Sequence, residues 1–215
     1  MFTNVSGDGR DIGRKSGAYA VVHSGGTARV VSLGDETYAI SRIKSGNTLK
    51  QVAKCKTCKA LKDDSLPVGE APQRTPDRFT SYLQNYGTDP PLYIYSVTDF
   101  YLDSGVPALR SGHVPSTGKV YMIGSDGSPG AYDRIRNGEY QVATVPEPLL
   151  EEGWVMVDEM NRAIQGGKPS GYVPAVHIID NTNMARDVTK DSVYEPHNNY
   201  RNHYKQIWKT GKTTR

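Results

Sequence analysis

The sequence has few of the features that would identify a function at once. Among its 215 residues are only two cysteines, Cys55 and Cys58, and there is no apolar run near the ~18 residues that a membrane-spanning helix needs. Its charges nearly cancel, with 26 lysines and arginines against 23 acidic residues, so no nucleic-acid partner is expected. The first residues lack the basic stretch, apolar segment and cleavage site of an export signal, which taken alone favours the cytoplasm. What remains is an ordinary globular composition, enough for one large or two small domains.

The two cysteines stand in a C-x-x-C motif flanked by lysines, Lys54-Cys-Lys-Thr-Cys-Lys59. This motif is compatible with a structural disulfide, a redox centre or half of a zinc site. The five histidines are scattered and no second cysteine pair is present, so we expect no metal site. Because the motif falls between a predicted helix and a short predicted strand, a disulfide between Cys55 and Cys58 is the preferred interpretation, ahead of redox chemistry.

Short apolar runs alternate with amphipathic stretches after residue 25. The runs are β-branched or aromatic and lie beside turn residues, which predicts strands over 28–34, 92–97, 119–124 and 140–145. Helices are predicted over about 37–54, 76–87, 102–112 and 129–137. The second and fourth start at hydroxyl–proline pairs, Thr75-Pro76 and Ser128-Pro129. Strand–helix–strand units at this spacing predict an α/β fold, a doubly wound open parallel sheet with helices on both faces.

Two further helices and a tail do not belong to this alternation. Residues 10–24 are predicted to form an amphipathic helix with no strand before it, with these side chains inward: Ile12, Ala18, Tyr19 and Val22. Residues 148–166 predict the longest helix, with one apolar stripe: Leu149, Trp154, Val157, Met160 and Ile164. An extended run follows over 172–180. The polar tail 184–215 is expected to wrap the domain, to end in a short helix and to be disordered over its last half-dozen residues.

Two catalytic motifs are weak or missing. Gly7-Asp-Gly-Arg-Asp-Ile-Gly13 looks like a phosphate-binding glycine loop, but its spacing is one residue too long and no strand precedes it. A turn capped by Asp8 is the better interpretation. There is no G-x-S-x-G motif and no serine or cysteine at a strand-to-helix elbow, which argues against a hydrolase.

Polar side chains follow the predicted strands at one kind of place, the carboxyl ends. They are Asp35 and Glu36, Thr98 and Asp99, Asp126, and Glu147. In an open parallel sheet, ligands bind outside the carboxyl ends of the strands. Any one of these residues could instead cap the helix that follows. Their alignment on one sheet edge favours a binding site there.

Three stretches resemble one protein family. They are Ile123-Gly-Ser-Asp-Gly-Ser-Pro-Gly-Ala131, Ile135-Arg-Asn-Gly138 and Ala143-Thr-Val-Pro-Glu-Pro148. Together they are similar to the type I periplasmic sugar-binding proteins of ABC importers, whose fold is shared with LacI-like repressors. The resemblance covers residues 6–181. It implies a protein that is not an enzyme and has no cofactor, and that captures a sugar or polyol by hinge closure between two lobes and presents it to an ABC permease.

The resemblance also implies roles for single residues. Asp126 matches a strand-end aspartate that accepts hydrogen bonds from sugar hydroxyls. Asp99, with Thr98, matches a polar pair on the neighbouring strand, and Glu147 matches the polar residue at a hinge crossover.

Two further candidates lie on the predicted helix 37–54. Arg42 is near, but out of register with, a ligand-gripping arginine of the family. Tyr38 is a candidate stacking face for the C–H groups of a sugar.

The chain departs from the family in length, because the sheet of the first lobe is absent. The implied division is a residual helix of that lobe (1–25), the C-terminal lobe (26–146), a first-lobe helix after the crossover (147–167), a crossover strand (168–183) and a C-terminal extension (184–215). In this interpretation helices 10–24 and 148–166 have both lost the sheet they pack on, so we expect homo-oligomers through them. The full-length parent would be periplasmic or extracellular.

Two alternative functions remain open from the sequence. The fold is equally suited to the effector domain of a LacI-like regulator or a sensor. A third class, more distant, is a thiol oxidoreductase that uses Cys55 and Cys58.

Overall fold

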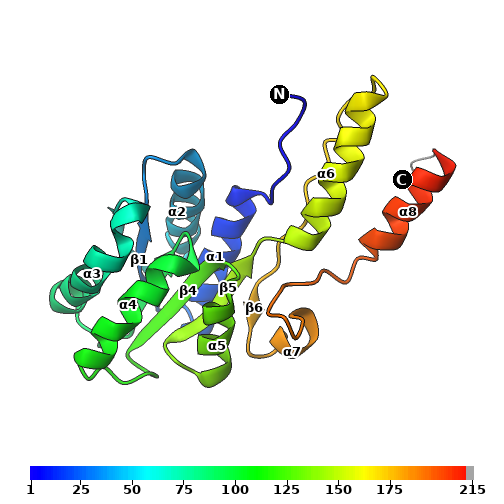
Figure 1. Ribbon diagram of the computed structural model, residues 1–215. Helices are drawn as coiled ribbons and strands as arrows, with labels where there is room; N and C mark the ends of the chain where they lie inside the picture. The colour runs from blue at the N-terminus through cyan, green and yellow to red at the C-terminus, as the bar shows by residue number, and fades with distance from the viewer. Residues whose placement is uncertain (212–215) are drawn as a thin grey trace.

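A computed structural model describes residues 1–211 and contains a six-stranded sheet in the order β2-β1-β3-β4-β5-β6 (Figure 1). The strands are β1 (Arg29–Gly34), β2 (Lys59–Ser65), β3 (Leu92–Ser96), β4 (Val120–Asp126), β5 (Gln141–Pro146) and β6 (Ile179–Asp180). The first five are parallel, and β6 pairs antiparallel with β5. The predicted α/β sheet is confirmed, with one short antiparallel strand added at its edge.

Helices α1 to α5 cover the two faces of this sheet, whereas α6 and α8 lie away from it (Figure 1). The helices are α1 (Gly9–His23), α2 (Ala39–Val52), the 3-10 turn η1 (Val68–Glu70), α3 (Ala71–Tyr86), α4 (Asp99–Ser111), α5 (Pro129–Asn137), α6 (Leu149–Ile164), α7 (Met184–Asp187) and α8 (Tyr200–Thr210). The chain moves from β1 to β2 in one direction along the sheet and from β2 to β5 in the other. Right-handed crossovers therefore place α2 on one face and α3, α4 and α5 on the opposite face. This is the doubly wound arrangement.

The central strands explain the stability of the sheet. All five residues of β3 are buried, as are all but the first residue of β1. Near-continuous apolar strands are typical of parallel sheets covered by helices on both sides. The edge strand β2 is instead largely exposed and carries Lys59 and Lys62, a composition that discourages pairing with another chain.

Two helix starts were predicted from hydroxyl–proline pairs, and one of them is wrong. Ser128 caps α5, because its hydroxyl accepts a hydrogen bond from the Ala131 N–H at 3.1 Å. The second helix begins at Ala71 rather than near Pro76, with a proline already in its first turn. Pro76 therefore lies inside α3, and the buried Thr75 hydroxyl caps nothing.

The prediction that helix 10–24 has no sheet to pack on is wrong. The helix, α1, packs along α2 and against the β4–β5 side of the sheet. Its docking face consists of small residues, so an added methyl group at Gly13 would overlap the backbone oxygen of Lys44. Ile12 is fully buried, whereas Val22, expected to face inward, is exposed. Helix α1 therefore packs on elements of this chain and belongs to the same body as the sheet.

Helix α6 projects away from the sheet and lies beside α8 (Figure 1). The predicted extended run over 172–180 forms a strand only at Ile179–Asp180. The predicted C-terminal helix is α8, and from residue 212 onward the expectation of disorder lies outside the described residues. Across residues 1–211, no helix has both the length and the apolar character needed to cross a bilayer.

Cys55 and Cys58 are joined by a disulfide, with their Cα atoms 5.3 Å apart. The bridge lies in the turn before β2, at the amino end of that strand. It is therefore at the opposite edge of the parallel sheet from the carboxyl ends, where the polar candidates were predicted.

Candidate functional site

A hollow of about 270 Å³ lies at the carboxyl ends of β1, β3 and β4. It is lined by Asp35, Tyr38, Ile40, Ser41, Lys44, Val68, Val97, Thr98, Tyr101 and Asp126. The strand order reverses between β1 and β3, so the connections that leave these strands diverge to opposite faces and open a crevice between them. The hollow therefore occupies the place where open α/β sheets bind ligands.

Lys44 organises this hollow, although the sequence reasoning missed it. It is 5% exposed, and its Nζ lies 2.8 Å from Asp126 Oδ1 and 3.6 Å from Glu147 Oε1. Burial lowers the pKa of Lys44, but the two carboxylates outweigh it and the net pKa is raised. A buried ammonium group thus fixes two of the predicted residues. Its signal is that the inward face of α2 is polar, with Ser41, Lys44 and the residues one turn further on at helical spacing.

Asp126 is the predicted residue best placed to meet a ligand. It ends β4 with φ of +86°, a conformation that non-glycine residues adopt rarely and at a cost in free energy. Its side chain is 44% exposed while one oxygen is held by Lys44. The second carboxylate oxygen remains available to accept hydrogen bonds from a ligand in the hollow.

Asp99 requires a correction, because the structure buries it. It is 1% exposed, and its Oδ2 accepts hydrogen bonds from the backbone N–H groups of Gly127 and Ser128 and from the Thr144 hydroxyl at 2.9–3.1 Å. Its Oδ1 accepts from Gln141 Nε2 at 2.8 Å. Burial raises its pKa to about 7, against the opposite pull of these hydrogen bonds. Asp99 thus holds the turn after Asp126 and cannot touch a ligand in this arrangement.

Thr98 stands at the wall of the hollow with a second task. Its hydroxyl accepts a hydrogen bond from the Phe100 N–H at 3.4 Å and so caps α4. Opposite it, Asp35 accepts from Thr37 and from the Val68 N–H at 2.9 Å, which holds the loop after β2 against the hollow. These hydrogen bonds lower the pKa of Asp35.

Glu147 lies beside the hollow and links two crossing segments. Its Oε2 accepts a hydrogen bond from the Gly7 N–H at 3.1 Å, so the chain that enters α1 is tied to the chain that leaves β5. The neighbouring Glu152 is buried, and burial together with the negative charge of Glu147 raises its pKa to about 7. The carboxylates at this junction are therefore crowded.

The two candidates predicted on helix 37–54 lie in different places, Tyr38 at the N-cap of α2 and Arg42 within it. Tyr38 is about half exposed at the mouth of the hollow, where its ring is free to cover a ligand. Arg42 is not brought to the hollow. It donates to the Glu36 backbone oxygen and lines a different depression beside β2 with Asp63 and Ser65.

The chain supplies carboxylate, hydroxyl and aromatic groups at one edge of the sheet. Within residues 1–211, no cluster of three or more histidine, cysteine or acidic side chains is arranged for a metal ion.

Comparisons with known proteins give no match to a family model and no significant sequence match to a curated protein. Solved structures do match. An ABC transporter periplasmic solute-binding protein from Actinobacillus succinogenes with bound D-allose gives a TM-score of 0.72 at 19% identity, over 86% of this chain and 64% of its own. A myo-inositol-binding protein from Caulobacter, bound to myo-inositol, gives 0.71 at 23% identity over 84% and 61%. A glucose-galactose binding protein from Geobacillus stearothermophilus gives 0.74 at 16% identity over 86% and 64%.

These matches confirm the fold expected from the sequence resemblance, that of the type I periplasmic sugar-binding proteins. At such low identity they establish the fold and no more. The chain spans less than two thirds of the length of each of these three proteins.

Proposed function

We propose that this chain forms the C-terminal lobe of a solute-binding protein that captures a sugar or polyol for an ABC-type importer. The observation that carries the proposal is the hollow at the reversal of strand order, where Asp126 is held by the buried Lys44. D-allose and myo-inositol are bound by two of the proteins that share the fold. A binding role without catalysis agrees with the sequence, which has no G-x-S-x-G motif and no serine or cysteine nucleophile at a strand-to-helix elbow.

The side chains of the hollow match the chemistry of a polyol. The free oxygen of Asp126 accepts hydrogen bonds from two vicinal hydroxyls, and charge makes such hydrogen bonds stronger than neutral ones. The Thr98 hydroxyl can accept or donate a further one, and the Tyr38 ring packs on C–H groups. Lys44 donates to one oxygen of the Asp126 carboxylate and leaves the other oxygen to accept from the ligand.

The remaining parts of the assembly are also proposals. A second lobe would close over the hollow by rotation about the segments joined by the Gly7–Glu147 hydrogen bond. The permease of the importer would be the partner of the closed form, and the full-length parent would work in the periplasm or outside the cell. The exposed apolar side chains of α6 would associate with a second copy when no lobe covers them.

The test is titration of the isotope-labelled chain with D-allose, D-galactose and myo-inositol, followed by amide chemical shifts. We expect saturable shifts at Thr98, Asp126 and Tyr38, with weak affinity because one lobe supplies half of the contacts. Asp126→Asn is expected to remove them, and Asp133→Asn, an exposed acid on α5, is the matched control. Binding that survives Asp126→Asn would overturn the site, and shifts confined to other faces would overturn the function.

A further inference from the structure

The face of α6 that turns toward the rest of the protein is acidic. Glu151, Asp158 and Glu159 are 1%, 4% and 4% exposed, whereas Met160 and Ile164 on the same helix are exposed. The spacing of seven and eight residues places the three acids on one stripe, two helical turns long. A buried carboxylate costs free energy unless donors or a cation compensate for lost hydration. Positive charge near this stripe would therefore stabilise the buried carboxylates.

The protein supplies only part of that charge. Asp158 accepts from Arg162 Nε at 2.7 Å and from Trp208 Nε1 at 2.9 Å. Glu159 receives both its hydrogen bonds from Ser170 through one oxygen. In the part of the chain that the structure describes, Arg162 is the single cation that forms an ion pair with this stripe. Three formal negative charges thus face one positive charge.

Glu151, like Glu159, keeps one buried carboxylate oxygen without a partner. Its Oε1 accepts from the Tyr172 hydroxyl at 2.7 Å and from Asn198 Nδ2 at 2.8 Å, both neutral donors. Its Oε2 is buried and has no hydrogen-bond partner. The hydroxyl of Tyr200, a residue that is 4% exposed, is likewise buried without a partner.

Both residues line a cavity of about 470 Å³ between α6, the segment after it and α8. Tyr172, Tyr204 and the ion pair of Asp158 with Arg162 line the same cavity, so aromatic rings, carboxylates and one paired guanidinium group share its wall. Its volume is in the range of small-molecule sites. It is separate from the hollow at the carboxyl ends of β1, β3 and β4, with which it has no lining residue in common.

We propose that this cavity binds a small organic cation, one that carries a primary ammonium or guanidinium group. Such a group donates N–H hydrogen bonds to the unpaired Glu151 oxygen and to the Tyr200 hydroxyl, and the tyrosine rings attract its positive charge through their faces. A metal ion is not favoured, because the described residues offer no cluster of three metal-binding side chains. A neutral sugar would leave the formal charge imbalance of the stripe uncorrected.

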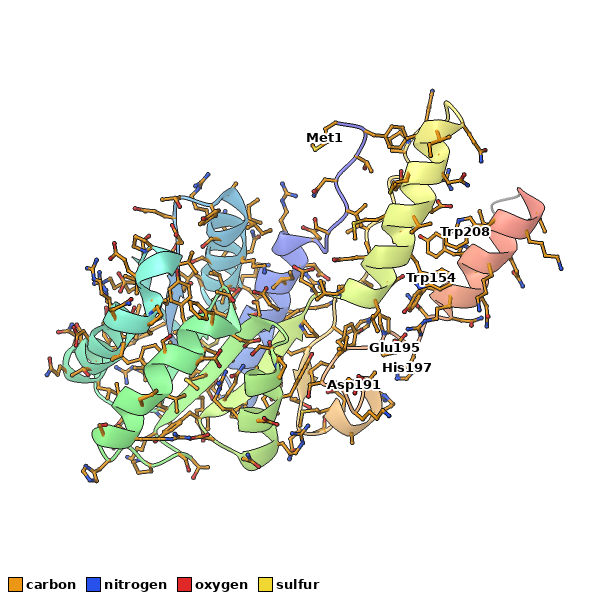
Figure 2. The ribbon with its side chains drawn as sticks, viewed as in Figure 1. Met1, Trp154, Asp191, Glu195, His197 and Trp208 are labelled. Carbon is orange, nitrogen blue, oxygen red and sulfur yellow. A yellow bond between two sulfur atoms is a disulfide. The ribbon has the colours of Figure 1, made fainter. Side chains whose placement is uncertain are left out.

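The reporter for this site is built into the chain. Trp154 and Trp208 stack with ring centroids 5.3 Å apart between α6 and α8 (Figure 2). Trp208 also bonds to Asp158 of the acidic stripe, so an occupied cavity should alter tryptophan fluorescence. These are the two tryptophans of the whole sequence.

The experiment titrates the full chain with n-butylammonium chloride, butylguanidinium chloride and the neutral 1-butanol, against sodium chloride at equal ionic strength. We expect a saturable fluorescence change with the two organic cations, and none with the alcohol or the salt. Glu151→Gln, which keeps the shape and removes the charge, should weaken binding at least tenfold. Tyr200→Phe is the second variant, because it removes only a hydroxyl.

Asp126→Asn and Asp133→Asn are the controls and should bind the cations as the unmodified chain does. Equal responses to butylammonium and 1-butanol, or to sodium chloride, would overturn the proposal, as would cation binding that both Glu151→Gln and Tyr200→Phe leave intact. Circular dichroism verifies that each variant is folded. Since Asp126 belongs to the proposed sugar site alone, failure of either site is distinguishable from failure of the other.

Discussion

The sequence predicts similar surroundings for helices α1 and α6, but the structure gives them different ones. Both were predicted to be amphipathic helices deprived of a sheet. Helix α1 docks on α2 through small residues, whereas α6 turns its acids inward and leaves Met160 and Ile164 in solvent. An apolar stripe therefore does not say whether a helix has a partner. A stripe of small residues at helical spacing, Gly13 and Gly17 in α1, is the better indicator of close helix packing.

The largest expected effect comes from a comparison of one glycine substitution in each of the two helices. Gly13→Ala places a methyl group against the backbone of Lys44, which cannot move aside without unwinding α2. We expect it to lower the free energy of unfolding by about 3 kcal/mol. Gly153→Ala in α6 meets nothing within 4 Å and should raise the free energy by up to about 1 kcal/mol, because alanine favours helix. Urea denaturation followed by circular dichroism measures both. Equal effects would contradict the docking of α1 on α2.

The second test compares buried carboxylates from the two regions. Asp99 receives four hydrogen bonds from the sheet and the turn before α5, whereas Glu151 on α6 receives two and keeps one oxygen unpaired. Asp99→Asn presents an N–H group to donors, so we expect a loss of about 2 kcal/mol in unfolding free energy. Glu151→Gln keeps an acceptor and removes an unpaired charge, so a change below about 1 kcal/mol is expected. Urea denaturation measures both changes. A larger loss of unfolding free energy in Glu151→Gln than in Asp99→Asn would contradict this comparison.

These carboxylates also show how far the sequence could predict the site. A strand-end aspartate looks the same in the sequence whether it binds a ligand, as we propose for Asp126, or receives hydrogen bonds from its own protein, as Asp99 does. The difference lies in hydrogen-bond donors from β5 and from the turn after β4, which are far from Asp99 along the chain. Lys44 was missed for the opposite reason. A lysine within a helix is ordinarily solvated, and only the sheet above it shows that this one is buried.

The fold was more predictable, because its signals are local. The four predicted strands are all present, since β-branched and aromatic runs next to turn residues have few other uses. The exposed edge strand β2, Lys59–Ser65, was predicted only as a short strand after the cysteine motif, because its lysines and aspartates resemble a loop. The start of α3 was misplaced because Pro72 and Pro76 are equally good first-turn residues. The burial of Ala71 in the core favours the earlier start.

A third test uses pH, because the pKa values of two acids near the starts of α1 and α6 are shifted in opposite directions. Burial and Glu147 raise the pKa of Glu152 to about 7, so the folded chain holds this proton longer than the unfolded chain does. Its contribution to stability therefore falls as pH rises from about 4.5 to 7. Burial raises the pKa of Asp11 in α1, but Lys15 and Arg14 outweigh it and lower it, so that contribution is lost as pH falls through the acid range.

Denaturation of the unmodified chain, Glu152→Gln and Asp11→Asn at pH 5 and pH 8 separates the two helices. Relative to the unmodified chain, Glu152→Gln should gain roughly 1 kcal/mol in unfolding free energy between the lower and the higher pH. Asp11→Asn should show no such gain, because that carboxyl is already ionised in both states across this range. A flat difference for Glu152→Gln would mean that Glu147 and Glu152 do not share a crowded junction.

Substitutions on the outer surface of α6 should have the smallest effect on stability and the clearest effect on association. Met160→Lys combined with Ile164→Lys replaces two exposed apolar side chains, so the unfolding free energy should change by less than about 0.5 kcal/mol. If copies of the chain associate through this face, light scattering at rising concentration will show the unmodified chain growing in mass and the double variant remaining a monomer. Val22→Lys is the matched control, because Val22 is an exposed apolar residue on α1, whose partner is already present. An unmodified chain that stays monomeric would contradict association through α6, while association that Val22→Lys also abolishes would mean that α1, although docked, supplies the contact surface.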